Sequence, residues 1–276
     1  MDVMREAHHA QVFRLLNHDL AGLLSVESLS DHLSALADTI LEETLAQCWR
    51  KLPKHHAPEH RFAILGYGKL GGKELGYASD LDLVFIHDDP DPDCQPIYAR
   101  LAQRINTWLD SHTAAGHLFE TDNRLRPNGD AGLMVVSLEA FEHYQRQNAW
   151  IWEHQALTRA RFCAGNAEVG ARFEALRTAV LCQTRAHEPL RTEVLAMRQK
   201  MRDAFANKGE GFELKHDAGG LIDVEFIVQY LVLAHAHEYP ALAENKGNIA
   251  LLQRCAAAGL IPAELAQQAG NAYRAM

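Results

Sequence analysis

The chain has 276 residues, of which 47% are hydrophobic and 23% charged, and its formal net charge is −9. These values are typical of a soluble globular protein with one large or two modest domains. The negative charge excludes a general electrostatic attraction to nucleic acid or to an anionic membrane surface. The five cysteines are scattered, which favours reduced thiols, and no stretch is apolar enough to span a bilayer. We therefore expect a cytoplasmic protein that binds neither nucleic acid nor membrane.

The N-terminal part of the chain predicts two helices. Apolar residues recur at helical spacing within residues 12–24 and again within residues 33–45, and Ser28 or Ser30 is placed to cap the second helix. Two prolines and a histidine-rich spacer then break the pattern. Residues 1–58 are therefore expected to form a helical lead-in, and nothing in them indicates chemistry.

The next stretch, Phe62–Ile86, is typical of a short apolar strand, a glycine-rich turn, a brief polar helix and a second apolar strand. Asp80 and Asp82 lie on the second strand, where alternate side chains share one face. Two carboxylates held close together repel each other unless a cation lies between them. Because backbone N–H groups of the glycines can approach phosphates, the stretch predicts a metal–nucleotide site.

Two further elements are predicted before residue 130. An amphipathic helix is expected from near Ile97 to Ser111. Residues 118–127 then alternate as a strand does and end at a proline. Four charged side chains share one face of that predicted strand: Glu120, Asp122, Arg124 and Arg126.

Beyond Ser137, which is placed to start a helix, the sequence predicts helices and no strand; a short strand is expected just before it, at residues 133–136. Trp150 and Trp152 belong to an aromatic stripe at helical spacing, and such a stripe more often packs into a core than binds a ligand. The remaining helical patterns cover residues 173–180, 190–206, 221–236 and 251–276. The last pattern stops without a capping residue, which indicates a chain cut from a longer protein.

The glycine-rich turn admits three interpretations. Gly66-x-Gly68-x-x-Gly71 matches a dinucleotide-binding fingerprint, but only Gly72 to Ala78 separate the turn from the next strand. A parallel crossover needs about a dozen residues or more, which argues against that interpretation. A purely structural turn with a solvated Asp-x-Asp is the second interpretation. It is weakened by Asp122 on the other predicted acidic strand, because clustered carboxylates repel strongly without a cation.

The third interpretation, a two-metal nucleotidyl-transfer site, is favoured. Asp80 and Asp82 would hold Mg²⁺ ions that bridge a triphosphate, and Asp122 would complete the site and help the metal lower the pKa of the nucleophile. Lys73 and the two arginines could add positive charge, or the arginines could pair with the carboxylates; the sequence leaves both roles open. The residues predicted to contact the nucleotide are Gly66, Gly68, Lys69, Gly71, Gly72, Ser79, Arg124 and Arg126.

These motifs together resemble those of the glutamine synthetase adenylyltransferase family. The resemblance rests on residues 66–77 and 79–85, and three later stretches agree with it: residues 122–127, 149–161 and 219–226. It implies an α+β fold with a polymerase-β-like nucleotidyltransferase domain, a mixed sheet with helices, at residues 59–185. The helical segment 1–58 would precede that domain, and a helical bundle, itself truncated, would follow at residues 186–276.

Family members have two similar halves. One half attaches AMP from ATP to a tyrosine of glutamine synthetase, and the other removes it by phosphorolysis. The motifs are more similar to the attaching, C-terminal half, with the removing half and a non-catalytic regulatory fragment as alternatives. The resemblance implies that Asp80, Asp82 and Asp122 are the catalytic, metal-binding carboxylates, that Mg²⁺ is the cofactor, and that glutamine and the PII signal protein are regulators. Lys215, Asp223 and Glu225 could bridge the two domains or contact the nucleotide, and a structural role is favoured.

Overall fold

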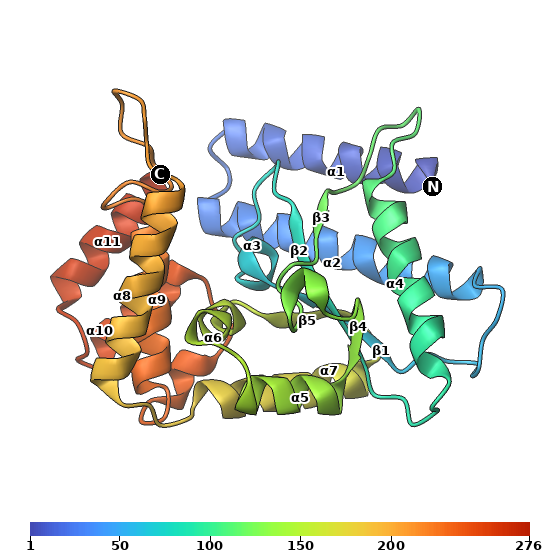
Figure 1. The fold of residues 1–276 in the computed structure, drawn as a ribbon. Helices are drawn as coiled ribbons and strands as arrows, with labels where there is room; N and C mark the ends of the chain where they lie inside the picture. The colour runs from blue at the N-terminus through green and yellow to red at the C-terminus, as the bar shows by residue number, and fades with distance from the viewer. The chain divides into compact units, whose positions relative to one another are not determined.

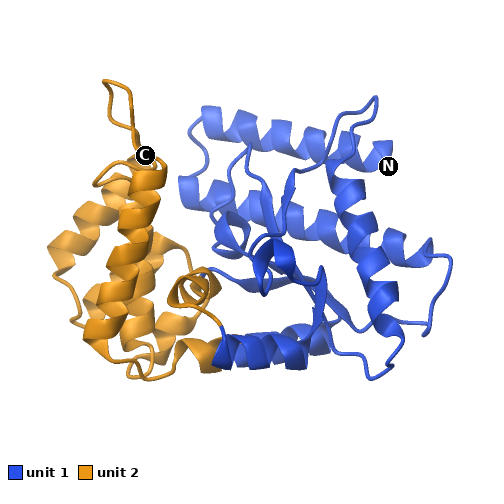
Figure 2. Ribbon diagram, in the orientation of Figure 1, with its two compact units in different colours: residues 1–148, 159–176 blue, residues 149–158, 177–276 orange.

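The computed structural model describes residues 1–276 and divides into two compact units. The first unit contains residues 1–148 and 159–176, and the second contains residues 149–158 and 177–276 (Figure 2). These units are defined by contacts between residues. The domain boundaries predicted from the sequence, near residues 58 and 185, are a different division of the chain and stay predictions. No helix is both long enough and apolar enough to cross a membrane.

Five strands and eleven α-helices make up the fold (Figure 1). The elements of the first unit are α1 (Asp2–Leu20), α2 (Val26–Arg50), β1 (Phe62–Gly66), α3 (Gly68–Gly71), β2 (Leu81–His87), α4 (Cys94–Asp110), β3 (Thr121–Asp122), the 3-10 helix η1 (Gly129–Ala131), β4 (Val135–Ser137), α5 (Leu138–Gln147) and β5 (Arg161–Gly165). Those of the second are α6 (Ile151–Thr158), α8 (His187–Ala204), α9 (Leu221–His235), the 3-10 helix η2 (Pro240–Ala243), α10 (Asn248–Ala257) and α11 (Ala263–Ala275). Helix α7 (Ala167–Leu181) begins in the first unit and ends in the second.

The sheet is mixed, as the predicted α+β fold requires. Its strand order is β3-β2-β1-β5, and β4 also pairs with β2. Strand β1 is antiparallel to both β2 and β5, whereas β2 is parallel to β3 and β4. Because β1 and β2 form an antiparallel pair, the glycine-rich turn between them is not part of a parallel crossover. The topology therefore confirms the rejection of the dinucleotide-binding interpretation.

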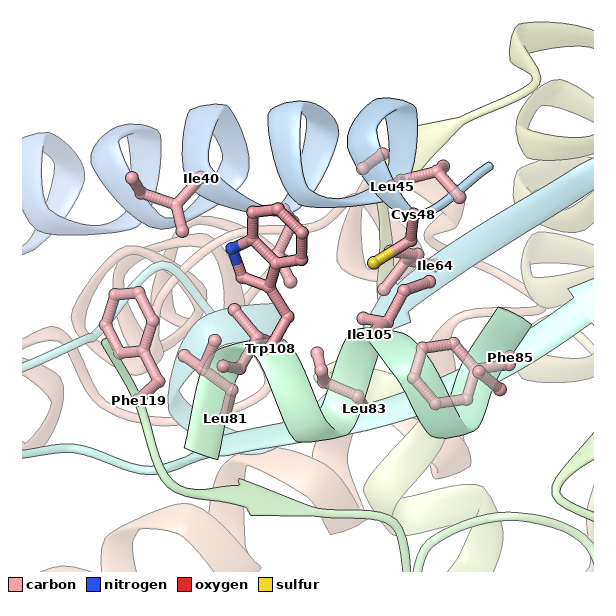
Figure 3. Close-up of a cluster of buried hydrophobic side chains, with 14 of the residues drawn as sticks. Ile40, Leu45, Cys48, Ile64, Leu81, Leu83, Phe85, Ile105, Trp108 and Phe119 are labelled. Atoms are coloured by element: carbon pink, nitrogen blue, oxygen red, sulfur yellow. The ribbon is translucent and has the colours of Figure 1, made fainter. Parts of the chain in front are cut away.

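The hydrophobic core of the first unit explains which way the aspartates point. Leu81, Leu83 and Phe85 of β2 lie in a buried cluster with side chains of α2 and α4 (Figure 3). Val84 and Ile86 are also buried but lie outside that cluster, on the opposite face of the strand. Asp82 shares their face by alternation, so its carboxylate points away from the core beneath α2 and α4.

The predicted N-terminal helices are confirmed, with one correction at a helix start. Ser25, rather than Ser28 or Ser30, is the N-cap of α2, and its hydroxyl accepts a hydrogen bond from the Ser28 N–H at 3.2 Å. Ser25 has the extended backbone that a capping residue requires, whereas the other two serines already lie inside the helix. Ser137 caps α5 in the same way, as its position predicted.

The prediction of a strand over residues 118–127 is wrong for most of its length. Only Thr121–Asp122 pairs with the sheet, because the backbone turns directly afterwards: the Arg126 N–H donates to the Asn123 carbonyl at 3.3 Å. Alternating charge alone does not distinguish a strand from a turn whose side chains fold back on one another. Strand β5 (Arg161–Gly165) was missed, because it is short and three of its five residues are only partly buried.

Two expectations in the C-terminal part also need correction. Trp150 and Trp152 are 66% and 39% exposed, so they are not core residues. The predicted helix over residues 251–276 is two helices, α10 and α11. Gly259 separates them, with a φ of +74° that ends the first helix, and a proline then caps the second.

Leu83→Ala tests the core that holds β2. Leu83 is fully buried, so we expect the free energy of unfolding to fall by about 2–5 kcal/mol. Urea denaturation followed by circular dichroism measures this change. Leu20, which is 78% exposed, provides the control, because Leu20→Ala should change stability by less than about 0.5 kcal/mol. Equal losses in the two variants would contradict the assignment of Leu83 to the core.

Candidate metal centre

The sheet brings the three predicted carboxylates together. Asp82 on β2 is paired with Asp122 on the parallel neighbour β3, so the two residues lie side by side in the register. Asp80 lies immediately before β2 rather than on it. One carboxylate oxygen from each of the three residues lies within 4.8 Å of the other two. This distance is short enough for all three to contact one cation, or two neighbouring cations, and metal binding itself stays a prediction.

The close approach of the three carboxylates affects the pKa of Asp82 most strongly. The pKa of Asp82 is raised from 3.8 to about 6, first by burial and then by the negative charges of Asp80 and Asp122. The positive charges of Arg159 and Arg124 oppose the shift without cancelling it. A cation that binds beside such a carboxylate stabilises its ionised form. The geometry therefore favours a positive ion at this point.

Asp122 has the opposite electrostatic environment because Arg124 lies beside it. The Arg124 Nε and backbone N–H both donate to the Asp122 carboxylate, each at 2.8 Å, and Nη2 forms an ion pair with it. Hydrogen bonding from Arg124 is the main cause of a lowered Asp122 pKa. The structure therefore shows Arg124 paired with a carboxylate, which is one of the two roles that the sequence left open. Asp122 stays ionised and is a weak proton acceptor.

The glycine-rich turn is packed directly against the carboxylates. Gly68 has a φ of +55°, and a Cβ atom placed on it would lie 2.1 Å from the Asp82 Oδ2. The Tyr67 N–H donates to the Asp82 carbonyl at 2.9 Å, which fixes the turn to β2. A Cβ on Gly71 would lie 1.9 Å from the Arg159 carbonyl oxygen. A side chain at Gly68 would therefore push the turn away from Asp82, and a side chain at Gly71 would push it away from the Arg159 backbone.

Two buried arginines hold this turn, and sequence reasoning did not assign either to the site. Arg159 is 6% exposed, and its Nη2 donates to the Glu74 Oε2 at 2.6 Å, just beyond α3. Arg161 donates from Nε to the Leu70 carbonyl at 3.2 Å and forms a two-pronged ion pair with Asp38 of α2. The signal was present in the sequence, because both arginines belong to the stretch 149–161 that resembles the family.

The other residues predicted to contact a nucleotide surround the cluster along the chain. Gly66 ends β1, Gly72 follows α3, and Lys69 is exposed. Ser79 accepts a hydrogen bond from the Gly76 N–H at 3.0 Å, so it closes the loop before Asp80. That these residues contact a nucleotide stays a prediction.

Two further charged residues of the predicted acidic strand do not join the cluster. Arg126 donates from Nη1 to the Asn123 carbonyl at 2.7 Å and stabilises the turn after β3. Glu120 is exposed and lies outside the group of three carboxylates, although its carbonyl accepts a hydrogen bond from the Leu81 N–H.

The later motif around Gly219 lies in the second unit, where its residues make structural contacts. Asp223 forms an ion pair with Arg198 and accepts a hydrogen bond from the Gly219 N–H at 2.6 Å. Glu225 accepts a hydrogen bond from the Tyr273 hydroxyl at 3.1 Å, which joins α9 to α11. These contacts agree with the structural role expected for Asp223 and Glu225.

Comparison with protein families assigns the part of the chain that contains the cluster. The family model described as glutamate-ammonia ligase adenylyltransferase matches residues 1–176. The chain belongs to this family. A second family model, described as PII-uridylyltransferase, matches residues 192–276, so the C-terminal helices of this adenylyltransferase-family chain are similar to a region of that second family.

Curated relatives carry the name bifunctional glutamine synthetase adenylyltransferase/adenylyl-removing enzyme. The relative from Aromatoleum aromaticum is 65% identical over 274 residues, which cover 99% of this chain and 29% of the relative. Those from Nitrosomonas eutropha and Chromobacterium violaceum are 59% and 56% identical over 99% of this chain, and 30% of each relative is covered. The chain thus spans less than a third of the length of these relatives.

The raised pKa of Asp82 predicts how pH changes stability. Between pH 3.8 and about pH 6, Asp82 keeps its proton in the folded chain but has released it in the unfolded chain. Asp82 therefore stabilises the fold at low pH, and this contribution is lost as the pH rises through about 6. In EDTA, Asp82→Asn should melt roughly 2–4 °C above the original chain at pH 7, and this difference should shrink toward pH 5. Differential scanning calorimetry at both pH values measures it, and a difference independent of pH would contradict the assignment.

Gly68→Ala tests the contact between the turn and the carboxylates. The added methyl group would collide with the Asp82 carboxylate, so we expect loss of the rise in melting temperature that Mg²⁺ should produce. Gly22→Ala is a matched control, because Gly22 also has a positive φ, +69°, but a Cβ there meets no atom within 4 Å. Backbone strain affects both variants, whereas only Gly68→Ala disturbs the cluster. A Mg²⁺ response retained in Gly68→Ala would refute this close packing.

Proposed function

We propose that this chain transfers AMP from ATP to a tyrosine hydroxyl of glutamine synthetase and releases pyrophosphate. The observation that carries the proposal is the cluster of Asp80, Asp82 and Asp122, with oxygens within 4.8 Å of one another beside a glycine-rich turn. Family membership supports the reaction class. Assignment to the attaching half rests on the resemblance of residues 66–77 and 79–85.

The donor set fits magnesium. Three carboxylates supply hard oxygen ligands, which Mg²⁺ prefers, and no cysteine or histidine belongs to the cluster. Burial, together with the negative charges of Asp80 and Asp122, raises the pKa of Asp82 to about 6, and Arg159 and Arg124 only partly oppose this rise. When bound, Mg²⁺ would polarise the phosphate oxygens and stabilise charge on the attacking and leaving oxygens.

The residues of the chain would position the reactants. Asp80, Asp82 and Asp122 would hold the cations, and the turn around Gly68 would lie against the triphosphate. The tyrosine oxygen would bond to the α-phosphorus while the bond from that phosphorus to the bridging oxygen of pyrophosphate breaks. Positioning and electrostatic stabilisation would provide most of the rate.

The phenolic proton is better accepted by water than by Asp122. Arg124 lowers the Asp122 pKa, so this carboxylate is a weak base near neutral pH. The metal-binding role of Asp122 agrees with this environment, because a lowered pKa keeps the ligand ionised. Arg124 is also the cation nearest to Asp122 that could move to a phosphate when nucleotide binds.

Removal of AMP by phosphorolysis is the second candidate function. It is favoured by the names of the relatives, which describe both activities, and by carboxylate chemistry that serves either direction. The whole protein's partners are also proposals for this chain. Glutamine synthetase would be the protein substrate, in the cytoplasm. The match of residues 192–276 to a PII-uridylyltransferase model supports the PII signal protein and glutamine as regulators.

An adenylylation assay tests the proposal. Glutamine synthetase, Mg²⁺ and ATP radiolabelled at the α-phosphate are incubated with the chain, and label on glutamine synthetase is measured. Asp80→Asn and Asp82→Asn should each slow labelling about a thousandfold, equivalent to about 4 kcal/mol of transition-state stabilisation. Asp31→Asn is the matched control, because Asp31 is an exposed aspartate outside the cluster, and it should keep the original rate.

The same proteins distinguish the alternatives. Formation of ADP from phosphate and pre-adenylylated glutamine synthetase, without labelling in the first assay, would assign the removing activity instead. Absence of both reactions with the folded chain would favour a regulatory fragment. Labelling that persists in the Asp80 and Asp82 variants would overturn the metal site.

A further inference from the structure

A basic cavity lies between the end of α2 and the outer side of α4, and it shares no residue with the carboxylate cluster. Its volume is about 670 Å³. The positively charged side chains that line it are Lys51, at the C-terminal end of α2, and Arg100 and Arg104 of α4. Gln103 and Thr107 add neutral polar groups between these charges.

The charge of this cavity is unbalanced within the protein. Its lining contains no aspartate or glutamate, although the chain as a whole has a net charge of −9. Most arginines of the first unit pair with a carboxylate, as Arg61, Arg159 and Arg161 do. Arg100 and Arg104 form no salt bridge, so an anion from solution would be their first counter-charge.

The spacing of the lining residues places their polar groups on one surface. Residues 100, 103, 104 and 107 of α4 lie three or four positions apart, and all four are exposed. Arg100 and Arg104 are a like-charged pair at a separation of four, and such a pair slightly destabilises a helix. The Lys51 Nζ lies 5.0 Å from the centre of the Trp108 ring of α4. This cation–π contact holds the Lys51 ammonium beside the cavity.

We propose that this cavity binds a small phosphorylated anion. Guanidinium groups match the oxygens of phosphate with paired hydrogen bonds, and the Gln103 amide can add a further donor. Three cations from two helices suit a ligand with two or more negative charges. A concave site of this volume is typical of small ligands, whereas a protein segment is more often bound on a longer groove or a flatter surface. This inference does not depend on the proposed AMP transfer.

Calorimetric titration with inorganic pyrophosphate tests the site. EDTA is present throughout, so that no divalent cation recruits the anion to the aspartates. Arg100→Gln combined with Arg104→Gln should weaken pyrophosphate binding at least tenfold without lowering the melting temperature, because both side chains are exposed and their mutual repulsion is removed. The matched control combines Arg14→Gln with Lys208→Gln, which removes the same charge from exposed positions outside the cavity.

The control variant and Asp82→Asn should bind pyrophosphate as the original chain does. Equal weakening in the two double variants would show charge screening alone and overturn the proposal. Binding that is strengthened in Asp82→Asn, which removes a repelling charge, but unchanged in the Arg100 and Arg104 variant would place the anion beside the carboxylates, and would also overturn it. A ten-residue glutamate peptide that binds more tightly than pyrophosphate, and depends on the same arginines, would replace the small anion with an acidic protein segment.

Discussion

Mutual repulsion among Asp80, Asp82 and Asp122 is the constraint around which the first unit is arranged. Three carboxylate oxygens within 4.8 Å of one another separate unless the backbone prevents it. The parallel pairing of β2 with β3 prevents it for Asp82 and Asp122, and the buried face of β2 anchors that pairing in the core. The packing free energy of the sheet therefore holds negative charges together, and their repulsion adds to burial in raising the pKa of Asp82.

The surrounding side chains fix the same geometry from several directions. The Asn106 Nδ2 of α4 donates to the Asn123 Oδ1 at 2.7 Å, and the Asn123 Nδ2 donates to the Leu83 carbonyl at 2.9 Å. Helix α4 is thereby connected to the residue that follows Asp122 and to the strand that carries Asp82. From the other side, Arg159 holds the turn through Glu74. Secondary contacts of this kind keep functional side chains within the small tolerances that catalysis needs.

The sequence allowed the central strands and the aspartate cluster to be predicted, because their signals are local. An apolar run, a glycine-rich turn and Asp-x-Asp alternation belong to one continuous stretch, and Asp122 lies in a second acidic pattern. The two-residue strand β3 and the strand β5 depend on pairing with distant residues, which local alternation does not reveal. Arg159 and Arg161 were not assigned to the site, because their partners, Glu74 and Asp38, are distant in the sequence. Helical spacing likewise did not reveal that the Trp150 side chain is exposed.

The parallel register of β2 and β3 has a consequence for the order in which the protein folds. Parallel neighbours cannot be joined by a tight turn, so Asp122 reaches Asp82 only after the chain has passed through the whole of α4. The antiparallel pairing of β1 with β2, in contrast, closes a short loop, so little chain entropy is lost when it forms. The glycine-rich turn can therefore acquire its shape early in folding, while a nascent or partly unfolded chain still lacks the complete set of carboxylates. Such a chain would lack the proposed cation site, and only molecules that have completed their tertiary structure would bring the three carboxylates together.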